Sequence, residues 1–250
     1  MERWCIGLDL GQAHDYSALS IVSAPQGVRE AQHNVPWLQR WPLGTPYPTI
    51  VGDTVALVAR LAAQHPHALR MLVVDATGVG RPVVDLFTQR HVRLAASLVA
   101  ATITGGSQAS FAPRPGGGQE WHLPKRELVS AMQLLLQSRR LHIAPALPEA
   151  ATLAAELQNF QVKITEAAHD TYGAWCEGTH DDLVLATALP CWSLLHGRWP
   201  RPFTPSVGGE RARLDGPPLT DKEMHAPFDG RGAVPGDVPI AAFGRGRGRY

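Results

Sequence analysis

Four aspartates stand at the edges of apolar segments, where carboxylates are uncommon. Asp9 interrupts the run RWCIGLDLG, Asp75 ends the run MLVVD, and Asp181 and Asp182 open a run of helix formers in GTHDDLVLATAL. An ionised carboxylate inside an apolar segment costs free energy unless it is paired or bound to a metal. Hard divalent cations such as Mg²⁺ and Mn²⁺ prefer oxygen ligands. Two such ions about 4 Å apart stabilise the attacking and leaving oxygens of a phosphoryl displacement. The residue types therefore predict a divalent-metal site where these carboxylates meet.

A simpler interpretation exists for each aspartate taken alone. Thr179 followed three residues later by Asp182 matches a capping box, and acids in a first helical turn suit the helix dipole. Asp9 and Asp75 could each begin a turn. Three such positions at the edges of core elements favour a shared anionic site, although spacing along the chain leaves both interpretations open.

The elements that must position these residues follow from apolar periodicity. It predicts strands at 3–11, 16–24, near 28–36, 69–77, 94–104 and 161–166, and helices at 49–65, 82–91, 124–140, 148–160 and from 181 onward, with a Gly/Pro-rich loop at 105–119. A meander of strands followed by alternating strands and helices predicts an α/β domain, a mixed sheet with helices on both faces. Strand alternation places Asp9 with Cys5, Gly7 and Gly11 on a face of small residues, where another element can fit.

Composition limits the class of protein and its surroundings. The chain of 250 residues has three cysteines without a C-x-x-C pair, which argues against a disulfide framework or zinc site. No apolar run approaches a membrane span and the N-terminus does not read as a secretory signal, so we expect a protein of the cytoplasm with no membrane partner. The net charge of +1 is too small for general attraction to nucleic acid.

The last fifty residues change character. Residues 201–250 contain 16 Pro and Gly, with eight basic and six acidic residues, and end in GRGRGRY. Such a segment buries too little apolar surface to offset its ordering entropy. We therefore predict a folded domain at 1–200 and a disordered C-terminal tail at 201–250.

Several segments together resemble the nuclease domain of tailed-phage terminase large subunits. They are IGLDLGQAHDYSALSIV, MLVVDATGVGRPVVDLF, LPKRELVSAMQLLL, RRLHIAP, LAAELQNF and THDDLVLATAL, in that order across 3–190. The resemblance implies an RNase H-like fold and a metal-dependent DNA endonuclease with two Mg²⁺ or Mn²⁺ ions, cutting concatemeric viral DNA during packaging.

By the same resemblance, Asp9, Asp75 and Asp182 are the expected catalytic metal ligands, with Asp181 as a helper. Lys125 is the expected phosphate contact, with Arg126 and His180 as further DNA-binding candidates. Double-stranded DNA is the implied substrate, in the cytoplasm of the phage's host.

One departure from the family pattern concerns the packaging motor. A full terminase large subunit also carries an ATPase with a P-loop, whereas the only lysines here, Lys125, Lys163 and Lys222, do not follow a glycine. We therefore expect any motor to act in trans, as a separate packaging ATPase alongside a small terminase subunit and a portal. The alternatives are a resolvase or transposase on the same fold, an actin-like nucleotide-binding protein, and an inactive DNA-docking module.

Overall fold

The computed structural model describes residues 1–11, 15–89, 92–106, 108–114, 118–167, 181–197 and 199. At its centre is an eight-stranded sheet in the order β6-β7-β5-β4-β1-β2-β3-β8. The strands are β1 (Glu2–Asp9), β2 (Ala18–Pro25), β3 (His33–Arg40), β4 (Leu69–Asp75), β5 (Ser97–Thr104), β6 (Ser110–Pro113), β7 (Gln119–Pro124) and β8 (Leu141–Ile143). The helices are α1 (Tyr47–Gln64), α2 (Gly80–Phe87), α3 (Lys125–Gln137), α4 (Ala150–Ala167) and α5 (Asp182–His196).

The sheet is mixed because its two halves are connected differently. Strands β1, β2 and β3 form an antiparallel meander joined by short connections, whereas β4 lies parallel to β1, and β5 and β7 continue in the same direction. Parallel neighbours need long crossovers. Helix α1 lies in the connection that leads to β4 and α2 in the connection from β4 to β5, whereas the connection from β5 to β7 contains β6. The predicted fold class, an α/β domain with a mixed sheet flanked by helices, is confirmed.

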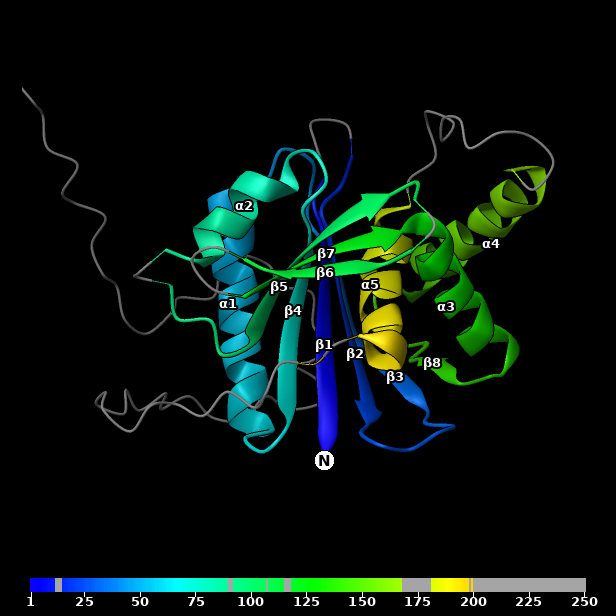
Figure 1. Ribbon diagram of the computed structural model, residues 1–250, viewed down its shortest axis with the longest axis horizontal. Helices are drawn as coiled ribbons and strands as arrows, with labels where there is room; N and C mark the ends of the chain where they lie inside the picture. The colour runs from blue at the N-terminus through cyan, green and yellow to red at the C-terminus, as the bar shows by residue number, and fades with distance from the viewer. Residues whose placement is uncertain are drawn as a thin grey trace, which may run out of the picture.

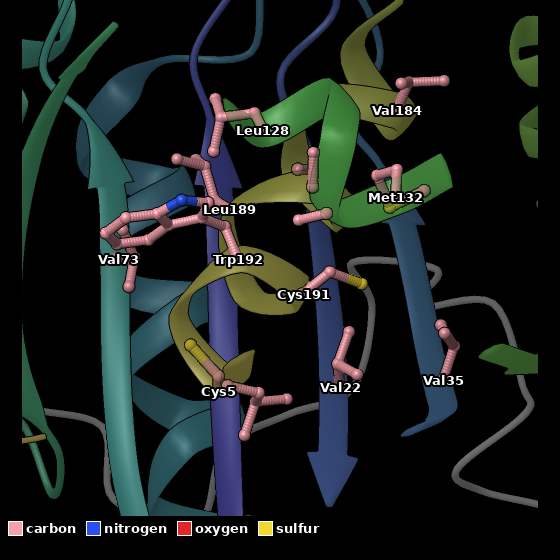
Figure 2. Packing of buried hydrophobic residues seen from close by; sticks show 14 of the residues in the cluster. Cys5, Val22, Val35, Val73, Leu128, Met132, Val184, Leu189, Cys191 and Trp192 are labelled. Carbon is pink, nitrogen blue, oxygen red and sulfur yellow. The ribbon is translucent and has the colours of Figure 1, made fainter. Parts of the chain in front are cut away.

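Helices cover both faces of the sheet (Figure 1), with α1 and α2 on one side and α3, α4 and α5 on the other. Strand alternation divides the core accordingly. Trp4, Ile6 and Leu8 of β1 pack with the α1 and α2 layer, whereas Cys5 packs with α5. Figure 2 shows this second layer, in which Leu189, Cys191 and Trp192 lie over β1 and its neighbours.

The small-residue face of β1 accommodates helix α5. A Cβ atom on Gly7 would lie 2.1 Å from the Ala186 carbonyl oxygen and 2.5 Å from Pro190 Cδ, so only glycine permits this approach. Pro190 has no N–H to donate to the Ala186 carbonyl four residues earlier, and it is this carbonyl that lies against Gly7. Gly7 and Pro190 thus bring α5 close to the strand that carries Asp9.

Two parts of the predicted element order were wrong. The strand expected at 161–166 is absent, because α4 continues without a break to Ala167. Its β-branched residues suggested a strand, but local preference is weak and no turn separates them from the preceding helix. The loop expected at 105–119 contains β6 and leads into β7, a hairpin that extends the sheet beyond β5.

The strand expected near 28–36 begins later, at His33, after a turn, and β8 pairs with its first residues at the far edge of the sheet. None of the described helices is long and apolar enough to span a membrane. The predicted tail, 201–250, lies outside the described residues, as does His180.

Candidate active site

Asp9 and Asp75 lie side by side at the carboxyl ends of two central strands. The parallel register pairs Leu8 with Val74, and each aspartate is the next residue of its strand. Their side chains point to the face covered by α5, since Cys5 and Val73 of the same strands belong to that layer. Both residues are buried, and burial raises the pKa of each carboxyl.

The turn that follows β4 fixes the orientation of the Asp75 side chain. The Thr77 backbone N–H donates to Asp75 Oδ1 over 2.8 Å, while the Thr77 hydroxyl oxygen accepts from the Ile103 N–H at 3.0 Å. Gly78 has a positive φ of 59°. A Cβ on Gly80 would lie 1.8 Å from the Asp75 carbonyl oxygen. The predicted GVGRP turn therefore needs its glycines to fold tightly against β4.

Helix α5 brings Asp182 to the same place. Asp182 is the first residue of the helix and is buried, and Asp181 is its N-cap. The capping box considered above is wrong in its register, because it required Thr179 as the N-cap. The Asp181 side chain makes no capping hydrogen bond.

A carboxylate that the sequence analysis missed performs the capping. Glu156 of α4 accepts hydrogen bonds at Oε2 from the backbone N–H groups of Leu183, at 3.0 Å, and Val184, at 3.2 Å. Its Oε1 accepts from Arg40 Nη1 at 3.2 Å. Glu156 follows Leu153 by three residues on the apolar stripe of its helix, and an acid on such a stripe was the available signal.

The four aspartates interact electrostatically. Burial raises the pKa of Asp9 well above its ordinary value, and the negative charges of Asp75, Asp182 and Asp181 raise it further, in that order. Burial also raises the pKa of Asp75, while hydrogen bonds from Thr77 and the positive charge of Lys125 oppose the rise. The residues predicted as metal ligands therefore form one acidic cluster, drawn from β1, β4 and α5.

Lys125 is close to this acidic cluster. It is the first residue of α3 and follows β7 directly, at the same end of the sheet as Asp75, and its charge lowers the pKa of that carboxyl. Arg126 is the next residue of the helix.

The donor set suits a hard divalent cation. It consists of carboxylate oxygens whose mutual repulsion a cation would relieve. Within the described ranges, however, no three His, Cys, Asp or Glu side chains are already spaced to hold a metal ion. The cluster supplies the charge and the oxygen atoms, and binding requires side-chain movement and ionised carboxylates.

Comparison with known proteins agrees with the family suggested by the sequence. No family model matches the chain. Over 189 residues it is 24% identical to the terminase large subunits of Thermus phage G20c and Thermus virus P23-45. The match takes in 74% of this chain but 30% of each relative, so the chain spans less than a third of the length of the curated relatives it matches.

Among solved structures, the chain is similar to a human cytomegalovirus terminase nuclease domain soaked with Mn. The identity is 11% and the TM-score 0.47, over 76% of this chain and 82% of that one. A second structure of that domain gives 9% identity and a TM-score of 0.41, over 77% and 84% of the two chains. The predicted resemblance of this chain to the nuclease domain of terminase large subunits is confirmed.

Proposed function

We propose that this protein is a metal-dependent DNA endonuclease of the terminase type, which cuts concatemeric viral DNA during genome packaging. The observation that carries the proposal is the meeting of three buried aspartates, Asp9, Asp75 and Asp182, from three different elements at one end of the sheet. Clustered buried carboxylates repel one another and destabilise the fold, which makes a purely structural role a poor explanation.

In this proposal Asp9, Asp75 and Asp182 would hold two Mg²⁺ or Mn²⁺ ions, with Asp181 assisting. Ions bound there would supply activation of a water molecule and stabilisation of the leaving oxygen of a phosphodiester. The protein's own contribution is orientation. Thr77 fixes the Asp75 carboxylate and α5 presents Asp182 from its first turn.

The proposed substrate is double-stranded DNA. Lys125, with Arg126 and His180, contacts the phosphates beside the scissile bond. The position of Lys125 near Asp75 supports this role, because a phosphate bound to ions at the cluster would lie within reach of its ammonium group. DNA translocation would come from a packaging ATPase, acting with a small terminase subunit and a portal in the host cytoplasm. The nuclease domain comprises residues 1–200, and 201–250 is a tail.

A cleavage assay with matched variants tests the proposal. Purified protein with Mn²⁺ or Mg²⁺ is expected to nick or cut plasmid DNA, and EDTA is expected to stop the reaction. Asp9→Asn and Asp75→Asn are expected to abolish cleavage, since each removes a ligand charge without changing side-chain volume. Asp85→Asn is the control, because Asp85 is an exposed residue of α2, on the opposite face of the sheet.

Both outcomes of this assay are informative. The control variant is expected to cleave at the wild-type rate, which would separate loss of the cluster from a general effect of losing an acid. Cleavage by Asp9→Asn at the wild-type rate would eliminate the proposed site.

A further inference from the structure

The first turn of α5 is held by a buried ion pair that belongs to other elements. Glu156 is 6% exposed, and both of its carboxylate oxygens are engaged, Oε2 by two backbone N–H groups of α5 and Oε1 by Arg40. The Arg40 guanidinium lies over the Tyr16 ring, 4.1 Å from its centroid. We call Arg40 and Glu156 the α5 clamp.

The register of the sheet explains why Arg40 is available here. Asp9 pairs with Ala18, and Ala18 pairs with Arg40, so the three residues form one row across β1, β2 and β3. Directly paired residues point to the same face of a sheet, and this face is the one covered by α5. The small side chain of Ala18 lies between an acid of the cluster and the cation of the clamp. The start of α5 fits above this row.

The clamp acts on the backbone directly after Asp182. Bonds to the N–H groups of Leu183 and Val184 satisfy two of the four donors that the start of a helix leaves without an intrahelical partner. Helix ends otherwise fray. Because these two amides follow Asp182 immediately, holding them sets the direction in which the Asp182 carboxylate leaves the helix.

A neutral side chain would cap this helix at lower electrostatic cost. Burial, and to a smaller extent the negative charge of Asp182, raise the pKa of Glu156 to about 7, against the opposing hydrogen bonds and the charge of Arg40. A fifth acid beside four others is a poor choice for stability alone, even with Arg40 as its partner. Its geometry, in which one carboxylate oxygen on a neighbouring helix accepts from two successive backbone N–H groups, is suited to precise placement.

We propose that Glu156, held by Arg40, is a positioning residue that orients Asp182 and Asp181 toward Asp9 and Asp75 for metal binding. The inference rests on the proposed function, which names the cluster as the metal site. It adds two residues to that site which contact neither metal nor DNA and act through the backbone of α5.

The test measures Mn²⁺ affinity by calorimetry without DNA, and amide exchange at Leu183 and Val184. Glu156→Ala is expected to bind Mn²⁺ about 10- to 100-fold more weakly, the usual effect of removing a group that orients metal ligands. It is also expected to speed exchange at both amides. Glu156→Gln keeps an acceptor oxygen for these amides but turns its NH₂ group toward Arg40. We expect Glu156→Gln to lose less Mn²⁺ affinity than Glu156→Ala. Adding Arg40→Gln to Glu156→Gln is expected to restore affinity, because the amide introduced at position 40 supplies an acceptor for that NH₂ group.

Val58→Ala is the control for stability. Val58 is a buried residue of α1 on the opposite face of the sheet, so its truncation destabilises the fold without touching α5. At a temperature where every variant is folded, Val58→Ala is expected to bind Mn²⁺ with wild-type affinity. A purely structural role for Glu156 predicts the same for Glu156→Ala, and that result would overturn the inference.

Charge is separated from position by the two Glu156 variants. Equal losses of affinity in Glu156→Gln and Glu156→Ala, with unchanged amide exchange, would mean that only the charge of Glu156 matters and would also overturn the inference. Should Glu156→Ala not fold, the single variant Glu156→Gln and the double variant with Arg40→Gln are compared instead, by the same two measurements. These measurements do not use DNA. Failure of the wild-type protein to cleave DNA would contradict the proposed nuclease function, whereas the role of the α5 clamp would still be tested by Mn²⁺ binding and amide exchange.

Discussion

At the scale of single residues, the molecule concentrates acids where burial makes them costly. Asp9, Asp75 and Asp182 are each less than 10% exposed, and the neighbouring acids raise the pKa of Asp9. Ordinary proteins keep buried charges paired. The mutual repulsion of these acids is therefore the residue-level reason to expect a cation site.

Asp181 and Asp182 are neighbours with different surroundings, and we expect different effects of mutation. Asp182 is buried inside the cluster, whereas Asp181 is the N-cap, and its charge has a smaller effect on the pKa of Asp9. Asp182→Asn is expected to abolish cleavage, and Asp181→Asn to reduce it by roughly 10-fold, as for a group that assists a ligand. Plasmid-nicking rates of the two variants measure this. Equal nicking rates in the two variants would show that Asp181 is not merely a helper of Asp182.

The acidic cluster also predicts how stability depends on pH without metal. The folded-state pKa of Asp9 is raised above its ordinary value of 3.8, and that of Glu156 is raised to about 7. At a pH between the ordinary and the raised pKa of each group, the folded protein binds more protons than the unfolded chain. The contribution of these groups to folding stability is therefore complete at low pH and is lost as pH rises.

We therefore expect the melting temperature in EDTA to fall relative to that of Asp9→Asn as pH rises from about 4 to neutrality, and Mn²⁺ to reverse the fall near neutral pH. Thermal scans of both proteins across this range measure the difference. A difference that grows in favour of the wild-type protein as pH rises would contradict the electrostatic account.

At the scale of elements, the site depends on how closely α5 approaches β1. Gly7 supplies the space. The Ala186 carbonyl oxygen, to which Pro190 has no N–H to donate, lies against it. The same approach brings the start of α5 above the row formed by Asp9, Ala18 and Arg40. Packing in the middle of the helix and placement of the ligand at its end are thus one structural requirement.

Gly7→Ala tests this requirement. Its Cβ would lie 2.1 Å from the Ala186 carbonyl oxygen, so helix or strand must move, at a cost of about 1–3 kcal/mol in the free energy of unfolding. We expect DNA cleavage to fall as well, since the movement displaces Asp182. Urea denaturation and the nicking assay measure the two effects.

Gly52→Ala is the matched control, because a Cβ at this position in α1 meets nothing within 4 Å. There we expect a gain of about 0.5–1 kcal/mol in stability from removal of a helical glycine, with unchanged cleavage. Wild-type stability in Gly7→Ala would show that α5 does not depend on this contact.

At the scale of the whole molecule, the described core is a closed unit. Both faces of the sheet are covered by helices, and two clusters of buried apolar residues fill the layers. The Pro/Gly-rich composition of residues 201–250 gives that segment little apolar surface to bury.

Deletion of 201–250 is therefore expected to leave the melting temperature nearly unchanged. Removing the Arg/Gly end is also expected to weaken DNA binding and to lower its dependence on salt, since fewer phosphate contacts release fewer counterions. Thermal scans and binding titrations at several salt concentrations measure these two effects. A large drop in melting temperature would mean that the domain boundary at residue 200 is wrong.

The sequence by itself determined the class of fold and named the acids that the structure brings together. Period-two and period-3.6 apolar patterns predicted most strands and helices, and Asp9, Asp75 and Asp182 were identifiable because each interrupts or borders an apolar run. These signals are local, and the chain carries them without reference to its fold. The same local reasoning failed at 161–166, where β-branched residues continue a helix, and in the loop that contains β6.

Only the tertiary structure decided which groups meet. Asp9 and Asp75 lie side by side because β1 and β4 are parallel neighbours, although 66 positions separate the two residues in the chain. Glu156 and Arg40 escaped notice because a glutamate in a helix and an arginine at a strand end are ordinary in sequence. The hydrogen bonds of Glu156 join it to residues 27, 28 and 116 positions away in the chain, and no local pattern encodes such contacts. Periodicity specifies the face that a side chain takes, whereas its partner on that face is set by how separate elements pack.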